Sequence, residues 1–512
     1  MWLRKAGMGM LIWGLVGPLG AVQEEGREGA PPEKQQESEP APPEAAQEKG
    51  RESAQHYNRG VALYKEGKLD EARAEFEKVL AIDAGDVTTM CWIACILLQQ
   101  EKAEEAVSYL ERAIKLSPKY ALAHNNLGNA YLAQGLIEPA LQEYQRAIEH
   151  DPQYADAYYN LANLLTRRNQ LDEAVEYYRK ALELDEQNAD YHNNLGNCYY
   201  LQGNLERAVQ EYQRATELAP QRSLAWTNLG LVRWELGRIA DSIVALEKAR
   251  ELDPQSFTVH LYLGMAYFSK GRFAEAEQEF LAAQQLQPKE PAVYFNLGVL
   301  YGRRLALDEA EEFYLKALEL QPQDPNALNN LGWVYFKRGR LEEAIARFKQ
   351  ALEKDNQFVL AHSNLALAYY RLGRWDEARR ELGIVVRLEP ENGEARTLLG
   401  DVCYEQKDYE AAATQYQEAL RLGVKDPEIH NKLGLIHERR GEFEPAIAEF
   451  QQALKLNPRY AHAYNNWGVV YERQGELVKA LEMYQKAVEL DPDSADFKYN
   501  LDRLVAAQQS AE

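Results

Sequence analysis

The sequence has few cysteines, no excess of positive charge and none of the common catalytic motifs. Its 512 residues include four Cys, and 80 Asp and Glu against 58 Lys and Arg give a formal net charge of −22. Because binding to nucleic acids and anionic membranes depends on Lys and Arg, this balance argues against both as partners. Glycine-rich phosphate loops, a GxSxG elbow and an HExxH zinc motif are also missing. We therefore expect a non-enzymatic protein without a cofactor.

A 34-residue period runs from Ser53 to Ser494 without insertion or deletion, giving thirteen units from 53–86 to 461–494. Position eight of the unit is Gly in ten copies and Ala in three, position twenty is Ala in all but one, and position twenty-four is always large. Each unit predicts two helices; in 121–154 their apolar residues recur at i, i+3 and i+4 around a break at Gly135. Since neither helix can bury its apolar stripe alone, the pattern predicts an all-α solenoid of stacked units.

This pattern resembles the tetratricopeptide repeat, as residues 361–378 illustrate through both helices of their unit. The resemblance covers residues 53–494 and implies a right-handed superhelix whose first helices line a concave groove. Residues 495–509 start like another first helix, but Arg503 and Gln508 stand where an internal copy would be buried. We therefore expect 495–512 to form a capping helix and tail with a solvated outer face.

The first residues differ from the repeats. A basic start, an apolar core over 7–17 and small residues at 18–21 predict a cleaved signal peptide over 1–21, and hence export to the periplasm or cell envelope. Two alternatives stay open: an uncleaved anchor over 6–22, and a cytoplasmic protein. Residues 22–52 are rich in Glu and Pro and predict a disordered linker.

Cysteine and histidine offer no metal site. Cys91 and Cys95 lie four apart on one predicted helix, where a disulfide would be strained, while Cys198 and Cys403 lie six repeats apart, so free thiols are expected. Six histidines occupy position four of their units: His56, His124, His192, His260, His362 and His430. Successive members are at least two repeats apart, so no two can share a zinc ion. Because other units carry an aromatic there, we interpret these histidines as half-buried packing residues.

The tetratricopeptide resemblance implies that positions two, five, six, nine, twelve and thirteen face the groove. Position six is rich in asparagine, with Asn126, Asn160, Asn194, Asn228, Asn296, Asn330, Asn364 and Asn466 as candidate peptide-binding residues. Asparagine both donates and accepts hydrogen bonds, as a peptide backbone requires. The row is similar to the asparagine ladder of the O-linked N-acetylglucosamine transferases, whose catalytic domain has no counterpart here. The alternative is that these asparagines only stabilise the repeats.

Basic and aromatic residues join this row at positions twelve and thirteen. Arg303, Lys337 and Arg371 fall beside Phe336 and Tyr370, a combination that suits an acidic, partly apolar peptide. The alternative is a solvated face whose cations complement the helix dipoles. We therefore predict a scaffold that binds proteins or extended peptides. A regulatory subunit of an enzyme complex and a cytoplasmic co-chaperone are the alternatives.

Overall fold

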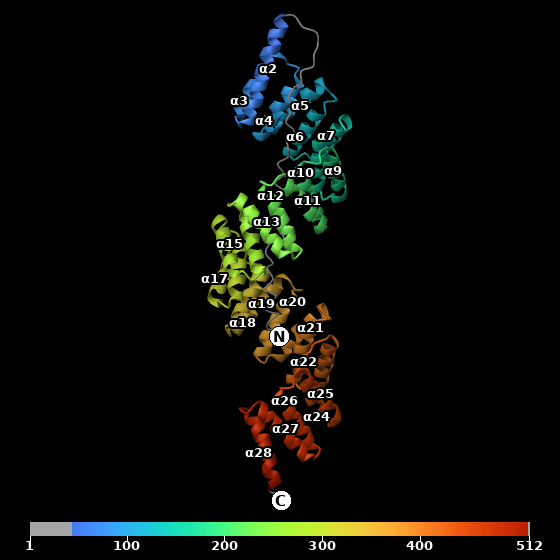
Figure 1. The fold of residues 1–512 in the computed structure, drawn as a ribbon, viewed down its shortest axis with the longest axis vertical. Helices are drawn as coiled ribbons and strands as arrows, with labels where there is room; N and C mark the ends of the chain where they lie inside the picture. The colour runs from blue at the N-terminus through green and yellow to red at the C-terminus, as the bar shows by residue number, and fades with distance from the viewer. Residues whose placement is uncertain (1–43, 510–512) are drawn as a thin grey trace. The chain divides into compact units, whose positions relative to one another are not determined.

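The computed structural model describes residues 44–509, over which the chain forms 27 α-helices and no strand. The chain divides between Pro288 and Lys289 into two compact units, whose described parts hold α2–α15 and α16–α28. Within each unit, helices follow one another in chain order as antiparallel pairs (Figure 1). This confirms the predicted all-α solenoid of paired helices.

The helices have the following bounds. The first unit contains α2 (Glu44–Lys65), α3 (Leu69–Ile82), α4 (Val87–Gln99), α5 (Ala103–Leu116), α6 (Ala121–Ala133), α7 (Ile137–His150), α8 (Ala155–Arg167), α9 (Leu171–Leu184), α10 (Ala189–Leu201), α11 (Leu205–Leu218), α12 (Ser223–Glu235), α13 (Ile239–Leu252), α14 (Phe257–Ser269) and α15 (Phe273–Leu286). The second contains α16 (Pro291–Arg303), α17 (Leu307–Leu320), α18 (Pro325–Lys337), α19 (Leu341–Lys354), α20 (Val359–Arg371), α21 (Trp375–Leu388), α22 (Gly393–Glu405), α23 (Tyr409–Arg421), α24 (Pro427–Arg439), α25 (Phe443–Leu456), α26 (Ala461–Arg473), α27 (Leu477–Leu490) and α28 (Ala495–Gln509).

From Val87 onward, each first helix begins at the first residue of its predicted unit. The start of the array differs from expectation, because α2 begins at Glu44 and the last part of the expected linker, 44–52, is helical. These nine residues follow Pro43 and consist mainly of Glu, Ala, Gln, Lys and Arg, which favour helix once no proline interrupts them. The expected signal peptide and the rest of the linker lie outside the described residues.

The small residue at position eight allows the two helices of a repeat to pack closely. A Cβ added at Gly332 would lie 2.7 Å from Cε1 of Phe348 and 3.2 Å from the carbonyl oxygen of Ala344. Both Phe348 and Ala344 are fully buried. The glycine at position eight, alanine at twenty and ring at twenty-four thus form one contact, as the repeat pattern predicts.

The first helices form the inner layer of each unit. First helices of adjacent repeats contact one another, as α16 does α18 and α18 does α20, whereas second helices pack mainly on first helices. Burial agrees: α18 is buried continuously from Ala327 to Phe336, while α19 buries only Ala344, Ile345, Phe348 and Ala351. The first helices are therefore the more buried layer of each unit.

The last helix, α28, covers the end of the array. Phe497 and Leu504 are buried against α26 and α27, and the guanidinium of Arg503 pairs with both carboxylate oxygens of Glu472 at 2.7 Å. The ion pair of Arg503 lies at the end of the array, so α28 presents a polar outer face.

Candidate functional site

The asparagines at position six are buried and do not line an open groove. Asn126, Asn160, Asn194, Asn228, Asn296, Asn330 and Asn364 expose between 0% and 7% of their surface. Asn466, in the last complete repeat, is half-buried. Their side chains therefore lie beneath the inner surface, because the neighbouring repeat covers them.

Most of these amides bond to the preceding repeat. The Nδ2 of position six donates to the side-chain oxygen at position five of the previous first helix: Asn160 to Asn125 at 3.0 Å, Asn194 to Tyr159 at 2.7 Å, Asn228 to Asn193 at 3.0 Å, Asn364 to Asn329 at 2.9 Å and Asn466 to Asn431 at 2.9 Å. The other three are also held internally. Asn126 donates to Sγ of Cys95, Asn296 donates to the Ala292 carbonyl, and Asn330 accepts from Asn329.

These contacts correct the prediction that the asparagine row binds peptide backbone. A buried amide already bonded to the neighbouring repeat would have to break that bond before binding a ligand, at a cost comparable to the bond gained. The alternative interpretation, in which the row joins successive repeats, agrees with the geometry. The sequence contains the signal for it, since the acceptors recur at position five.

A second candidate group, on α18 and α20, combines two buried rings with two exposed cations. Trp333 and Phe336 stack with ring centroids 5.2 Å apart and planes 15° apart. Lys337 places its Nζ 5.7 Å from the Trp333 centroid, and Arg371 its Cζ 5.8 Å from that of Phe336. The rings are 5% and 7% exposed, whereas both cations are exposed. We call these four residues the cationic surface.

The two cations of this surface have no acidic partner. Among residues 44–509, Lys337 and Arg371 make the aromatic contacts just described and no ion pair. Trp333 was not among the predicted site residues, although its spacing of three from Phe336 puts both on one helix face. Arg303 is exposed at the equivalent position of α16. Tyr370 turns to Trp375 instead, edge to face at 5.1 Å, and burial raises its pKa.

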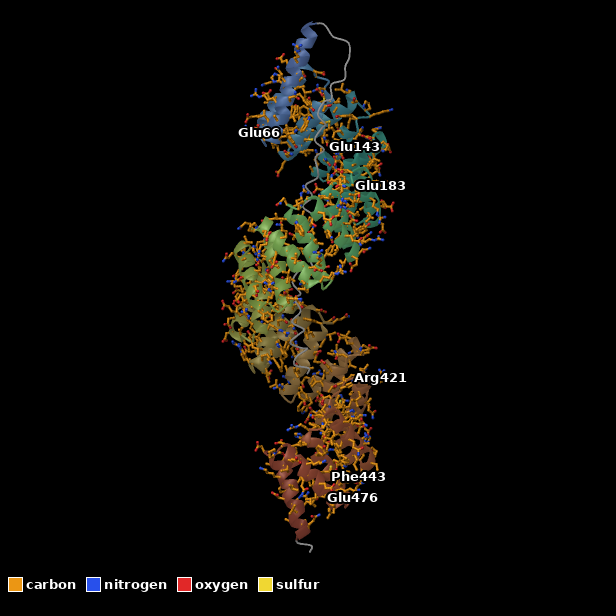
Figure 2. The ribbon with its side chains drawn as sticks, in the orientation of Figure 1. Glu66, Glu143, Glu183, Arg421, Phe443 and Glu476 are labelled. Atoms are coloured by element: carbon orange, nitrogen blue, oxygen red, sulfur yellow. The ribbon has the colours of Figure 1, made fainter. Side chains whose placement is uncertain are left out.

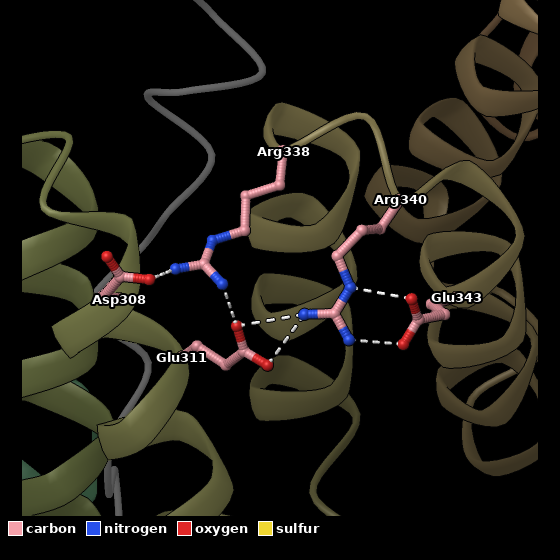
Figure 3. Close-up of polar contacts among 5 residues, drawn as sticks. All are labelled: Asp308, Glu311, Arg338, Arg340 and Glu343. Atoms are coloured by element: carbon pink, nitrogen blue, oxygen red, sulfur yellow. Dashed lines mark hydrogen bonds and ion pairs between the residues drawn. The ribbon is translucent and has the colours of Figure 1, made fainter.

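Neighbouring arginines form ion pairs with acidic side chains, whereas Lys337 and Arg371 do not. In Figure 3, Glu311 lies between the guanidinium groups of Arg338 and Arg340, at 2.6 Å and 3.0 Å. Arg338 also pairs with Asp308, and Arg340 with Glu343, whose pKa falls because of that hydrogen bond. These contacts join α17 to the turn between α18 and α19. Their charges are thus balanced within the protein.

The six histidines at position four are not simple packing residues. Nδ1 of each lies 2.5–2.7 Å from the carboxylate of a glutamate at position twenty-three of the same unit. These pairs are His56–Glu75, His124–Glu143, His192–Glu211, His260–Glu279, His362–Glu381 and His430–Glu449. Glu143, labelled in Figure 2, carries one of them on α7. No other unit has Glu at position twenty-three, so the sequence held a signal for the pairing.

The second ring nitrogen of His260 also lies beside an acceptor. In His260, Nε2 lies 3.1 Å from the Pro254 carbonyl oxygen, which can only accept. Trp226, at the same position of its unit, donates its indole N–H to the equivalent carbonyl of Pro220 at 3.0 Å. The protonated imidazolium donates from both nitrogens, to the Glu279 carboxylate and to the Pro254 carbonyl. The pKa of His260 is accordingly raised, chiefly by its bond to Glu279.

Comparison with known proteins places the chain in a family. The model described as Cilia and flagella-associated protein 70 C-terminal domain matches residues 154–356, 221–432 and 282–504, and two tetratricopeptide repeat models match 53–86 and 93–155. The three overlapping matches together span more than half of the chain, as expected when one model aligns with a repeated unit in several registers. The chain belongs to the tetratricopeptide repeat family. This fold supports a role in protein–protein interaction.

Several solved structures are similar. One is pilF of Pseudomonas aeruginosa, at 28% identity over 41% of this chain and 96% of that chain, with a TM-score of 0.38. Another is YrrB, described as a TPR protein with an unusual peptide-binding site, at 29% identity over 36% and 95% of the two chains and a TM-score of 0.34. The APC/C hetero-tetramer Cut9–Hcn1 aligns at 16% identity over 88% and 96%, with a TM-score of 0.39. A search of the curated proteins gives no significant match. Among the helices of residues 44–509, none is long and apolar enough to cross a membrane.

Proposed function

We propose that this protein is a non-enzymatic scaffold that binds an extended, acidic and partly apolar polypeptide on the inner helices of its second unit. The observation that carries the proposal is the cationic surface, where Lys337 and Arg371 lie on stacked rings without an acidic partner. The protein as a whole carries a net charge of −22, whereas this part of the inner helices presents two exposed cations. An acidic partner would supply the missing charges.

The rings and the cations have different roles in this proposal. Trp333 and Phe336 are already buried, so they contribute a rigid apolar floor and hold the cations in place. Lys337 and Arg371 keep their N–H groups free for carboxylates, which form the stronger, charge-assisted hydrogen bonds. Selection of an acidic peptide would therefore depend on ionic strength, since exposed charges are screened by salt.

The test compares two pairs of substitutions in the full chain. Lys337→Gln with Arg371→Gln removes the cationic surface. Lys316→Gln with Lys349→Gln is the matched control, because these exposed lysines lie 5.8 Å and 5.9 Å from the rings of Tyr294 and Tyr369 but sit on the second helices α17 and α19. The probe is a labelled peptide that alternates Glu with Phe, beside one that alternates Lys with Phe.

Loss of two exposed charge contacts of about 0.5–1 kcal/mol each should weaken binding of the acidic peptide about 5- to 30-fold at low salt. At high salt the difference should shrink, and the control pair should bind like the parent protein. Equal weakening in both pairs, or preference for the Lys-containing peptide, would refute the proposed surface. Thermal unfolding of each variant checks that the fold is unchanged.

We further propose that the protein acts in the periplasm or cell envelope after removal of residues 1–21. The support is the basic start, apolar core and small residues of that segment. Mass analysis of the protein from an envelope fraction should find an N-terminus near Val22. Retention of Met1 would leave the anchored or the cytoplasmic alternative.

A further inference from the structure

A cavity of about 730 Å³ opens in the second unit beside the turns that follow the first helices. Its walls come from the start of α23 and the ends of α24 and α26, including Lys407, Tyr409, Arg439 and Arg473. The cavity therefore lies at the edge of the repeats, apart from the α18 and α20 residues of the cationic surface. Its lining is strongly charged.

The charges in this lining do not balance. Three carboxylates line the cavity, and each is paired with an arginine: Asp408 with Arg379 at 3.0 Å, Glu410 with Arg440 at 2.6 Å, and Glu438 with Arg473. Lys407 and Arg439 also line it, and among residues 44–509 neither forms an ion pair. Two positive charges thus face one cavity without a counter-charge.

Arg439 stacks on an aromatic ring. Its Cζ lies 5.0 Å from the ring centroid of Tyr409, and Tyr409 in turn contacts Tyr404 edge to face at 5.4 Å. The Cζ of the neighbouring Arg473 lies 5.3 Å from the ring centroid of Phe443, which is labelled in Figure 2. The guanidinium of Arg473, however, is bonded to Glu438. A stacked guanidinium without an acidic partner keeps its N–H edge for an oxyanion, with little mobility left to lose on binding.

Lys407 occupies a position that most repeats give to glycine. It has φ +63° in the turn between α22 and α23, whereas the equivalent turn residue is a glycine such as Gly339 or Gly441 in most other repeats. A side chain in this left-handed conformation is strained, and such strain persists where the surrounding structure requires it. Here it places a lysine at the rim of the cavity.

From the cavity, the two unpaired cations and the strained lysine, we propose that this site binds an oxyanion group carrying two negative charges. The group would be a phosphorylated side chain or a pair of neighbouring carboxylates, both of which present several oxygens to Lys407 and Arg439. The inference that a polypeptide carries this group rests on the proposed function. The inference that the cavity binds an oxyanion is independent of it.

The experiment measures binding of labelled peptides and of inorganic phosphate to the full chain. Three peptides differ at one place, which holds phosphoserine, two adjacent aspartates or serine. Lys407→Gly removes one charge and also relieves the backbone strain, so loss of binding cannot be ascribed to unfolding. Leu305→Gly is the matched control, since Leu305 has φ +59° in the equivalent turn of another repeat. Arg439→Gln removes the second charge.

The phosphoserine peptide should bind more tightly than the serine peptide, and inorganic phosphate should compete with it. Lys407→Gly and Arg439→Gln should each weaken binding at least 5-fold, while Leu305→Gly leaves it unchanged. Equal binding of the aspartate peptide would assign the site to carboxylates, and weaker binding would assign it to phosphoryl groups. Binding unaffected by both substitutions, or absent for phosphate and for both charged peptides, would overturn the proposal.

A second comparison separates this site from the proposed function. The pair Lys337→Gln and Arg371→Gln should leave phosphate binding unchanged while weakening the Glu-containing peptide. If that pair abolishes phosphate binding as fully as Lys407→Gly does, the cavity is not a separate site.

Discussion

Replacement of His260 by phenylalanine tests the charge state of the buried histidines. His260 and Glu279 are 11% and 8% exposed in their side chains, and Nδ1 lies 2.6 Å from the carboxylate. Glu279 also pairs with Arg250 of the preceding repeat, so it keeps a basic partner when the histidine is lost. Phenylalanine keeps a ring of similar size but makes neither hydrogen bond.

The expected loss of stability follows from the two hydrogen bonds of His260. A hydrogen bond between charged groups contributes about 1.5–3 kcal/mol and one to a carbonyl about 0.5–1.5 kcal/mol. Phenylalanine recovers part of this loss through apolar burial. We expect His260→Phe to lower the local free energy of unfolding by about 2 kcal/mol at pH 6.

The effect should depend on pH with a definite sign. The pKa of His260 is raised above its ordinary value of 6.5, chiefly by the bond to Glu279 and against the effect of burial. The stabilisation is therefore fully present below pH 6.5 and is lost as the pH rises through the folded-state pKa. At pH 8.5 the parent protein should have lost most of the advantage, leaving a difference of about 1 kcal/mol or less.

Hydrogen exchange of α14 and α15 amides at both pH values, corrected for intrinsic exchange rates, measures the local free energy. Repeats with tyrosine at position four, such as those of Tyr158 and Tyr294, are internal controls within the same molecule. Their corrected protection should change less between pH 6 and 8.5 than that of α14 and α15. If His260→Phe lowers the local free energy of unfolding equally at both pH values, His260 is not charged. The same conclusion would follow if the α14 amides of the parent protein were better protected at pH 8.5 than at pH 6.

Three further predictions concern the repeats themselves. Gly332→Ala should lower the free energy of unfolding by about 1–3 kcal/mol through overpacking, because the new Cβ would lie 2.7 Å from Phe348. Urea unfolding combined with hydrogen exchange should show that only the adjoining repeats are destabilised. Asn364→Ala should lower the free energy of unfolding by about 1–3 kcal/mol, because the buried Oδ1 of Asn329 loses its hydrogen-bond donor. If the substitution instead weakens peptide binding without lowering stability, Asn364 is a ligand-binding residue. The four cysteines are buried, and burial raises the pKa of Cys198 to about 11. They should therefore react with a thiol reagent only at the rate of unfolding. Fast labelling of the native protein would contradict their burial.

The regular architecture could be predicted from the sequence alone. Helix starts such as Val87, Ala121 and Pro325 coincide with the first residue of their predicted units. The Gly332, Ala344 and Phe348 contact also follows from the repeat pattern. Both are local properties: a helix needs only its own periodicity, and a repeat contacts only its neighbours. The predicted disordered linker over 22–52 was wrong for its last part, 44–52, because a prediction from the overall Glu and Pro content missed a short stretch of helix-forming residues.

The tertiary structure alone decided which polar side chains are available to a ligand. Asn364 and Lys337 both fall on inner helices at positions expected to face the groove, yet the amide is buried against Asn329 and the cation is exposed. Lys337 and Arg338 are adjacent in sequence, but Arg338 is paired with Glu311 and Lys337 with no acid. Position within a repeat predicts the direction of a side chain. Whether an oxygen of the next repeat lies within 3 Å depends on how the repeats stack, and that distance determines whether a polar group stabilises the fold or remains free to bind.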